Sequence, residues 1–182
     1  MKRQHLRPFA GAFVIAASLS IPLAISAQVS FEGRVGATIP TGELTDSPGL
    51  DQSAGFSFAF DGMFTFRPSL SAYAGVSRQT FNCSDCPTDV ATVGFDGGLK
   101  FLFTASGAAT PWLRGGFMLH RASVDGVDSD WGVGVDAGAG LDWLVGPRIA
   151  IVPAVRLNSY GSGPLSLTYF TLDLGLHVHP GS

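Results

Sequence analysis

Positive charge, cysteine and long hydrophobic segments are all scarce in this sequence of 182 residues. Lys and Arg number 11 against 14 Asp and Glu, which gives a formal net charge of −3. No basic patch is visible, so we do not expect a nucleic-acid partner. Beyond the N-terminus, no apolar run approaches the roughly 20 residues that a membrane-spanning helix needs. If the chain crosses a bilayer, it does so as a closed sheet, because every backbone N–H and C=O group must be paired there.

The first 27 residues have the pattern of a secretory signal peptide. A basic start is followed by an apolar, small-residue-rich stretch from Phe9 to Ala24, and Ile25-Ser26-Ala27 forms a cleavage site. An uncleaved membrane anchor is the alternative, but the apolar stretch is short and interrupted for a spanning helix. We expect a signal peptide over residues 1–27 and one domain over residues 28–182.

Phenylalanine alternates with small or polar residues between Phe56 and Phe66, and weaker versions of this pattern recur downstream. Alternate side chains of a strand point to opposite faces, so each segment has one apolar face and one small or polar face. Asp61 lies on the polar face of this stretch. A soluble barrel of the lipocalin type would have to pack the Phe face into a small interior. An apolar exterior around a polar interior, typical of transmembrane β-barrels, fits the pattern better.

Turn residues divide residues 28–182 into eight expected strands, each about long enough to cross a membrane when tilted. They are Val29–Ile39, Ser53–Phe66, Leu70–Phe81, Ala91–Thr104, Pro111–Ala122, Gly132–Val145, Ile149–Ser159 and Leu167–His179. Long and short connections alternate, and in outer-membrane barrels the short turns face the periplasm. The predicted fold is all-β, an eight-stranded antiparallel transmembrane β-barrel preceded by a cleaved signal peptide, with both termini in the periplasm.

Ten charged residues fall at positions expected to face the barrel interior. They are Glu32, Arg34, Asp61, Asp96, Lys100, Arg114, Asp136, Asp142, Arg156 and Asp173. One interpretation is a plug of paired charges, because eight strands enclose only enough room for side chains and an unpaired buried charge is costly. The alternative is an ion path or a binding site.

The other eight acidic residues lie in the first three long loops. They are Glu43, Asp46, Asp51, Asp85, Asp89, Asp125, Asp128 and Asp130. With only Arg121 as a nearby cation, that rim should have a negative potential. Solvation alone explains acidic loops, and the sharper hypothesis is weak binding of divalent cations that bridge to lipopolysaccharide phosphates. The segment from Asp125 to Asp130 only partly matches the spacing of a preformed calcium loop.

Aromatic residues gather near the expected strand ends, which predicts one belt at each membrane interface. Phe31, Phe66, Phe103, Trp112 and Trp143 lie toward the short turns, and Phe56, Phe81, Trp131, Tyr160 and Phe170 toward the long loops.

Cys83 and Cys86 are the only cysteines and share one polar loop. In an exported chain, such a pair most simply forms a disulfide. C-x-x-C also occurs in redox and zinc sites, but those use a helix N-terminus or a second ligand pair, and neither is visible in the sequence. We expect a structural disulfide.

Two histidine arrangements are candidate chemical sites. His120 and Ser123 are three apart, hence on opposite faces of a strand, and no acid is spaced to orient the imidazole of a hydrolytic triad. His177 and His179 share a strand face that could hold a metal, but no third ligand is spaced near them, so a solvated pair is expected. The sequence therefore predicts no catalytic residue, no metal and no cofactor.

Four segments carry strand and turn motifs of a known family: Val35–Gly42, Thr110–Gly116, Ala137–Asp142 with Gly146-Pro147-Arg148, and Asp173–Leu176. They resemble the small eight-stranded outer-membrane β-barrels of the OmpA/OmpX type, over nearly all of residues 28–182. The resemblance implies the outer membrane of a Gram-negative bacterium, with outer-membrane lipid, lipopolysaccharide and the barrel assembly machinery as partners. We expect a structural or surface-interaction role through the long acidic loops, without enzymatic activity. A lipid-modifying enzyme similar to lipid A deacylases, or a narrow pore, are the alternatives.

Overall fold

A computed structural model describes residues 28–41, 52–83, 90–104, 107–124, 127–162 and 165–180. Eight long strands form the barrel wall: β1 (Gln28–Thr41), β3 (Gly55–Arg67), β4 (Leu70–Cys83), β5 (Val90–Leu102), β6 (Ala109–Val124), β8 (Gly132–Gly146), β9 (Ile149–Ser162) and β10 (Leu165–Val178). Two short strands, β2 (Gln52–Ser53) and β7 (Val127–Asp128), pair with the ends of β4 and β6. Within the described ranges, no helix is long and apolar enough to cross a membrane.

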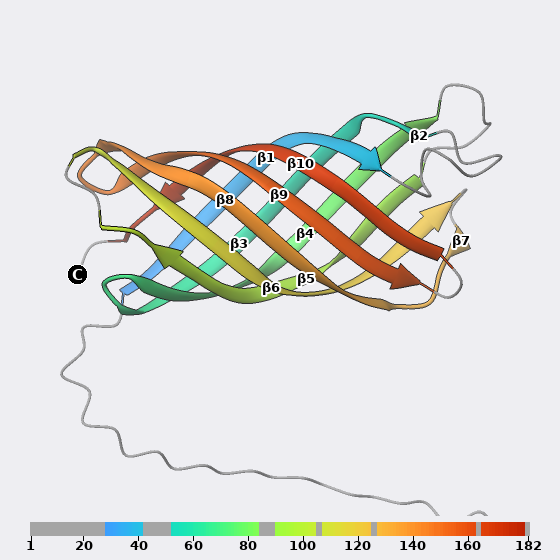
Figure 1. The fold of residues 1–182 in the computed structure, drawn as a ribbon, viewed down its shortest axis with the longest axis horizontal. Helices are drawn as coiled ribbons and strands as arrows, with labels where there is room; N and C mark the ends of the chain where they lie inside the picture. Colours follow the sequence, from blue (N-terminus) through green and yellow to red (C-terminus); the bar gives the residue numbers. More distant parts are fainter. Residues whose placement is uncertain are drawn as a thin grey trace, which may run out of the picture.

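The barrel closes because β1 pairs antiparallel with β10, from Phe31 opposite Val178 to Thr41 opposite Thr168. Every other long strand pairs with the long strands before and after it in the sequence, so the wall has no free edge (Figure 1). The start of β1 and the end of β10 lie at the end of the barrel that holds the short turns. The predicted eight-stranded antiparallel barrel is confirmed.

The predicted strands match the observed ones closely, with one break. Ser53 belongs to β2, and Ala54 separates it from β3, so the expected strand Ser53–Phe66 is two elements. Both elements pair with β4, which explains why the alternation of side chains reads as one continuous strand.

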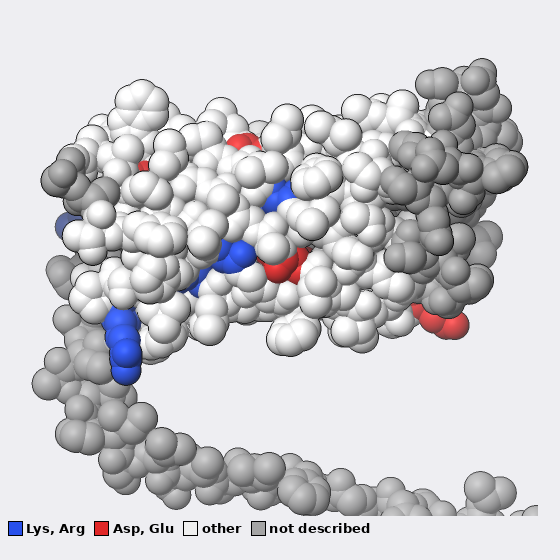
Figure 2. All heavy atoms as spheres, in the orientation of Figure 1, with Lys and Arg blue, Asp and Glu red and all other residues white. Residues whose placement is uncertain are grey.

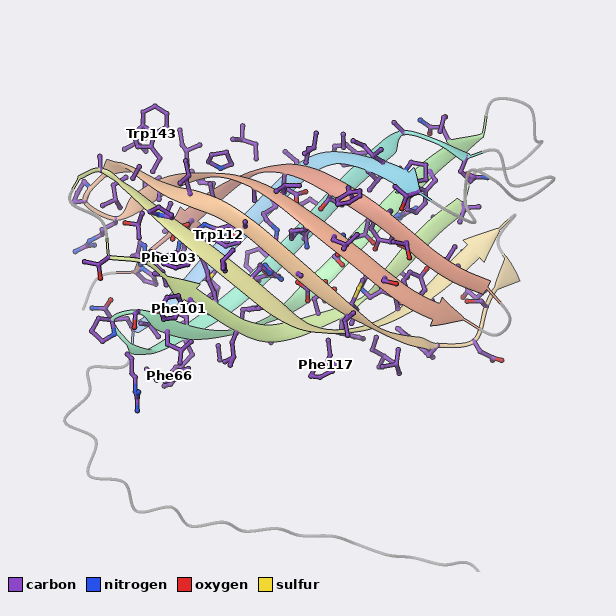
Figure 3. The ribbon with its side chains drawn as sticks, viewed as in Figure 1. Phe66, Phe101, Phe103, Trp112, Phe117 and Trp143 are labelled. Carbon is purple, nitrogen blue, oxygen red and sulfur yellow. The ribbon has the colours of Figure 1, made fainter. Side chains whose placement is uncertain are left out.

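On every long strand, most of the large aliphatic and phenylalanine side chains point outward. In β3, Phe56 and Phe58 are 55% and 49% exposed, while Ser57 and Asp61 between and after them are buried. The face seen in Figure 2 is mostly uncharged, and Figure 3 shows Phe101, Phe117 and Trp143 projecting away from the wall. A protein surrounded by water rarely exposes so large a continuous apolar surface. The wall is therefore built to face lipid, as the alternation predicted.

The aromatic belts are smaller than the sequence suggested, because three of the predicted members point inward. Trp112, Phe81 and Tyr160 are at most 2% exposed. Trp112 has the same strand parity as Arg114, so it faces the lumen although it lies near a strand end (Figure 3). Nearness to a strand end sets the depth of a residue in the membrane, whereas parity sets its face. The outward aromatic residues at the two ends, such as Trp143 and Trp131, remain as belt residues.

We predict that Phe58→Arg and Leu174→Arg each lower the free energy of unfolding by about 2–4 kcal/mol, because both side chains face lipid near the membrane midplane. Both residues pair with Val35, which lies in the middle of β1. Urea unfolding in lipid vesicles measures the change. Val29→Arg, on the same face near the short-turn end, is the control and should cost only about 0–1 kcal/mol. Equal losses at all three positions would contradict the assigned depth.

Candidate functional site

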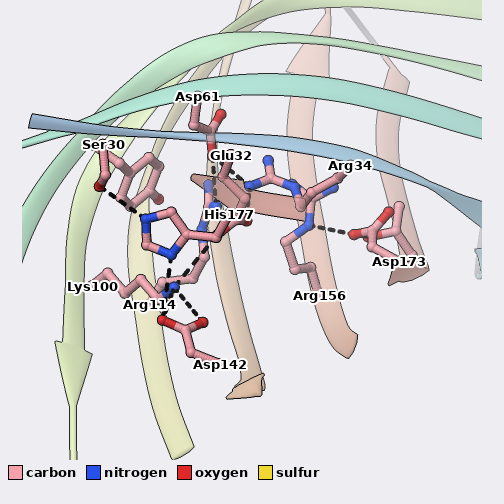
Figure 4. A network of polar contacts seen from close by, with 12 residues as sticks. Ser30, Glu32, Arg34, Asp61, Lys100, Arg114, Asp142, Arg156, Asp173 and His177 are labelled. Atoms are coloured by element: carbon pink, nitrogen blue, oxygen red, sulfur yellow. Dashed lines mark hydrogen bonds and ion pairs between the residues drawn. The ribbon is translucent and has the colours of Figure 1, made fainter. Parts of the chain in front are cut away.

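The lumen holds a network of charged side chains that crosses the barrel (Figure 4). All ten charges expected in the interior are buried there: Glu32, Arg34, Asp61, Asp96, Lys100, Arg114, Asp136, Asp142, Arg156 and Asp173. Each of the six carboxylates contacts at least one arginine, lysine or histidine. Strand alternation brings these residues inward, and the small diameter of eight strands brings them into contact.

Asp61 is the centre of this network. Its Oδ2 atom accepts hydrogen bonds from Arg34 of β1 and, at 2.9 Å, from Nη1 of Arg114 on β6. Arg34 also donates from Nη1 to Oε1 of Glu32 at 2.8 Å. The bond between β3 and β6 spans the lumen, because β4 and β5 separate these two strands in the wall.

A second cross-lumen contact involves Tyr73 of β4 and Asp136 of β8. The tyrosine hydroxyl donates to Oδ1 of Asp136 at 2.9 Å. The guanidinium of Arg114 lies 3.7 Å above the Tyr73 ring and its Nε atom is 3.3 Å from Asp136. Gly98 and Gly116 line this place, and a Cβ on either would lie within 2.8 Å of the tyrosine hydroxyl. The glycines of β5 and β6 therefore make room for the ring in the lumen.

Apolar side chains fill the lumen at the long-loop end. Phe81, Val90, Met118, Tyr160, Leu167 and Tyr169 form one buried cluster there. Trp112, Ala150 and Val152 form a smaller cluster toward the short turns. Ions do not pass readily through tightly packed apolar side chains, since a charge loses its hydration there. This arrangement favours the plug interpretation of the interior charges.

Glu32, Asp142 and His177 meet at the short-turn mouth of the lumen, and one ligand atom from each lies within 4.8 Å of the others. Lys100 lies among them, with Nζ 2.8 Å from Oδ1 of Asp142 and 3.4 Å from Oε2 of Glu32. A cavity of about 260 Å³ adjoins the group and is lined by Lys100, Asp142, His177 and His179, among others.

The expectation of a solvated pair at His177 and His179 needs correction. His177 is buried, and its Nε2 atom lies 2.8 Å from Oγ of Ser30. The ring of His179 lies 4.2 Å from that of His177, and partial burial together with His177 lowers the pKa of His179. Local spacing in the sequence could not show the carboxylates beside His177, because Glu32 and Asp142 come from other strands. The pairing of β1 with β10 places Glu32 opposite His177.

His120 also has an acidic partner that the sequence reasoning missed. Its Nε2 atom lies 2.9 Å from Oδ1 of Asp96 on the neighbouring strand and 3.3 Å from Oγ of Ser77. A catalytic triad needs the acid on one ring nitrogen and the serine on the other. Here both contact the same nitrogen, and the ring is fully buried. The geometry is that of a buried polar cluster rather than a hydrolytic site.

Several predicted features lie outside the described residues. They are the signal peptide over 1–27, Cys86 and the side chain of Cys83, and the loop carboxylates Glu43, Asp46, Asp51, Asp85, Asp89 and Asp125. The disulfide therefore stays a prediction. At the rim that is described, Arg121 contacts Asp128 at 2.6 Å, and both side chains are exposed.

Comparison with known proteins identifies the fold. No family model and no curated relative matches the chain. Neisserial surface protein A shares 18% identity at a TM-score of 0.70, over 82% of this chain and 96% of that one. The attachment invasion locus protein Ail of Yersinia pestis, in complex with the heparin analogue sucrose octasulfate, shares 14% identity at a TM-score of 0.53. The match covers 84% of this chain and 99% of Ail. OprG, an outer membrane protein of Pseudomonas aeruginosa, shares 11% identity at a TM-score of 0.51, and the match covers 85% of this chain and 98% of OprG.

These similarities show that the chain has the fold of small eight-stranded outer-membrane barrels, as the sequence resemblance predicted. The expected localisation in the bacterial outer membrane agrees with this fold and with the apolar wall. At these identities the comparison shows the fold and leaves the function open.

We predict that Asp61→Asn lowers the free energy of unfolding by about 3–5 kcal/mol, because it leaves Arg34 and Arg114 without their shared buried carboxylate. Urea titration in lipid vesicles measures the change. The control is Asp128→Asn, which removes the exposed partner of Arg121 and should cost at most about 1 kcal/mol. If both substitutions had the same small effect, the network would not stabilise the barrel.

We also predict that Gly116→Ala lowers the free energy of unfolding by about 1–3 kcal/mol through overpacking. The new methyl group would lie 2.4 Å from the Tyr73 hydroxyl and 2.3 Å from the backbone oxygen of Gly97. Gly33→Ala is the matched control, since a Cβ there meets nothing within 4 Å. The same unfolding assay should show little change for the control, and a neutral Gly116→Ala would refute the tight packing around Tyr73.

Proposed function

We propose that the protein is an outer-membrane β-barrel that acts through the surface at its long-loop end, without enzymatic activity and without conducting ions. The filled lumen is the observation that carries the proposal. Six apolar side chains occupy the long-loop end, and the charges below them are paired, in part between neighbouring strands and in part across the barrel. With the interior occupied in this way, the proposal places the partner at the loops.

The same observations weigh against the two alternatives. A narrow pore would need an open path through both the apolar cluster and the ion pairs. A lipid-modifying enzyme would need a nucleophile and base accessible to lipid, whereas Ser77 and His120 are buried in the lumen. Outer-membrane lipid and lipopolysaccharide remain the proposed surroundings, and the barrel assembly machinery the proposed partner during insertion.

Charge suggests the class of partner at the loops. The structural neighbour Ail is bound to a heparin analogue, which is a polyanion. In this chain the three long loops contain eight carboxylates by sequence, and Arg121, a described cation at that end, already contacts Asp128. A negative rim repels polyanions and attracts cations. We therefore propose a cationic partner, either a basic protein surface or divalent cations that bridge to lipopolysaccharide phosphates.

The test measures binding of the folded protein, in lipid nanodiscs, to surfaces coated with polylysine or heparin. We expect binding to polylysine that weakens as salt rises from low to physiological ionic strength, and no binding to heparin. A variant with the loop carboxylates changed to Asn or Gln should bind polylysine about tenfold more weakly, since it loses the attracting charge. Heparin binding, or unchanged binding by the variant, would overturn the proposal.

Two controls accompany this experiment. Arg67→Gln with Arg148→Gln changes charge at the short-turn end, where both residues are exposed, and should leave polylysine binding unchanged. Conductance across planar bilayers tests the closed lumen separately. Reproducible channel steps from the unmodified protein would revive the narrow pore.

A further inference from the structure

We propose that Glu32, Asp142 and His177 form a binding site for a divalent transition-metal ion such as Zn²⁺ at the short-turn mouth of the lumen. His179 lines the same cavity, and its ring lies 4.2 Å from that of His177. The inference goes beyond the proposed function, since it concerns the opposite end of the barrel and does not depend on what the loops bind.

The donor set suits such an ion. One imidazole nitrogen and two carboxylates are common ligands of zinc, which binds nitrogen and oxygen at about 2.0–2.2 Å. The Nδ1 atom of His177 lies 3.5 Å from Oδ2 of Asp142, close to the spacing of roughly 3.4 Å between two ligands of one tetrahedral zinc ion. Glu32 reaches the same place from β1, directly opposite His177 in the sheet.

The orientation of His177 is the second, independent observation. Its Nε2 atom lies 2.8 Å from Oγ of Ser30, and which of the two atoms donates depends on the tautomer. With the ring proton on Nε2, Nδ1 is left as an acceptor. The Nδ1 atom has no hydrogen-bond partner among the described residues, although the side chain is only 4% exposed. Nδ1 faces Oδ2 of Asp142 at 3.5 Å, an approach that is stabilised either by a proton on Nδ1 or, with the proton on Nε2, by a bound cation. Ser30 acts as the outer partner that fixes a metal-binding imidazole in place.

Lys100 is the cation that already contacts both carboxylates. Its Nζ atom contacts both oxygens of Asp142, at 2.8 and 3.0 Å, and Oε2 of Glu32 at 3.4 Å. The ammonium also lies 4.6 Å from the centre of the Trp112 ring, where cation–π attraction can hold it when the ion arrives. Metal binding is therefore a competition between the ion and the lysine for the same carboxylates.

The cavity gives the ion a route to the site. It is lined by the short-turn residues Pro68 and Thr110 as well as by Asp142, His177 and His179. The second buried histidine of the lumen differs in this respect. His120 contacts one carboxylate, with Nε2 2.9 Å from Oδ1 of Asp96, and packs beside Tyr160 of the apolar cluster. No second carboxylate joins it within the described part of the chain. It serves as an internal control.

The experiment is calorimetric titration of Zn²⁺ into the folded, untagged protein in detergent micelles, with four variants. We expect one saturable site in the unmodified protein. His177→Gln should weaken it at least tenfold, Asp142→Asn should do the same, and His120→Gln should leave it unchanged. Lys100→Met should tighten it about tenfold, because the competing cation is gone. This opposite sign separates ligand competition from general damage to the lumen.

Two further readouts make every outcome decisive. Zinc should raise the unfolding temperature of the unmodified protein and of Lys100→Met, because it binds the folded state alone. It should not do so for His177→Gln. Co²⁺ should give visible absorption bands of four-coordinate geometry that disappear in His177→Gln, which distinguishes this site from loose binding by the acidic loops. If neither the unmodified protein nor Lys100→Met bound either ion, or if His177→Gln and His120→Gln behaved alike, the proposal would be wrong.

Discussion

The pairing of β1 with β10 is the constraint on which the rest of the molecule depends. In lipid, an open sheet edge would leave a row of backbone N–H and C=O groups without partners. Closure removes both edges at once, and it also fixes the strand register around the whole ring. That register decides which side chains face each other inside, so the positions of Glu32, Asp61 and His177 follow from a backbone requirement.

A second requirement is that charges buried in the lumen must be paired. Ten charged side chains share a space that eight strands keep narrow. Arginines meet the carboxylates in the middle, and aromatic and aliphatic side chains close the long-loop end. The two ends of the barrel are consequently unlike. One is packed and apolar inside, and the other has a cavity beside a lysine, two carboxylates and a histidine.

The sequence predicted the wall well because alternation is a local property. The run from Phe56 to Phe66 shows which side chains face lipid without any knowledge of neighbours. The site was harder to foresee because its contacts join residues far apart in the chain. Asp96 meets His120, and Glu32 meets His177, only through strand pairing. Trp112 shows a different limit of the sequence-based prediction. Its nearness to a strand end gave its depth in the membrane correctly, but only its place in the strand alternation shows that it faces the lumen.

The ion pair between Asp61 and Arg114 has a consequence for how the barrel is assembled. These residues lie on β3 and β6, which touch only across the completed interior. A single hairpin, or the sheet from β1 to β5, would hold one member of the pair without the other in a low-dielectric environment. A partly assembled barrel therefore has an unpaired charge as well as an open sheet edge. Both costs are removed when the missing strands join the sheet. We therefore expect the barrel to assemble cooperatively.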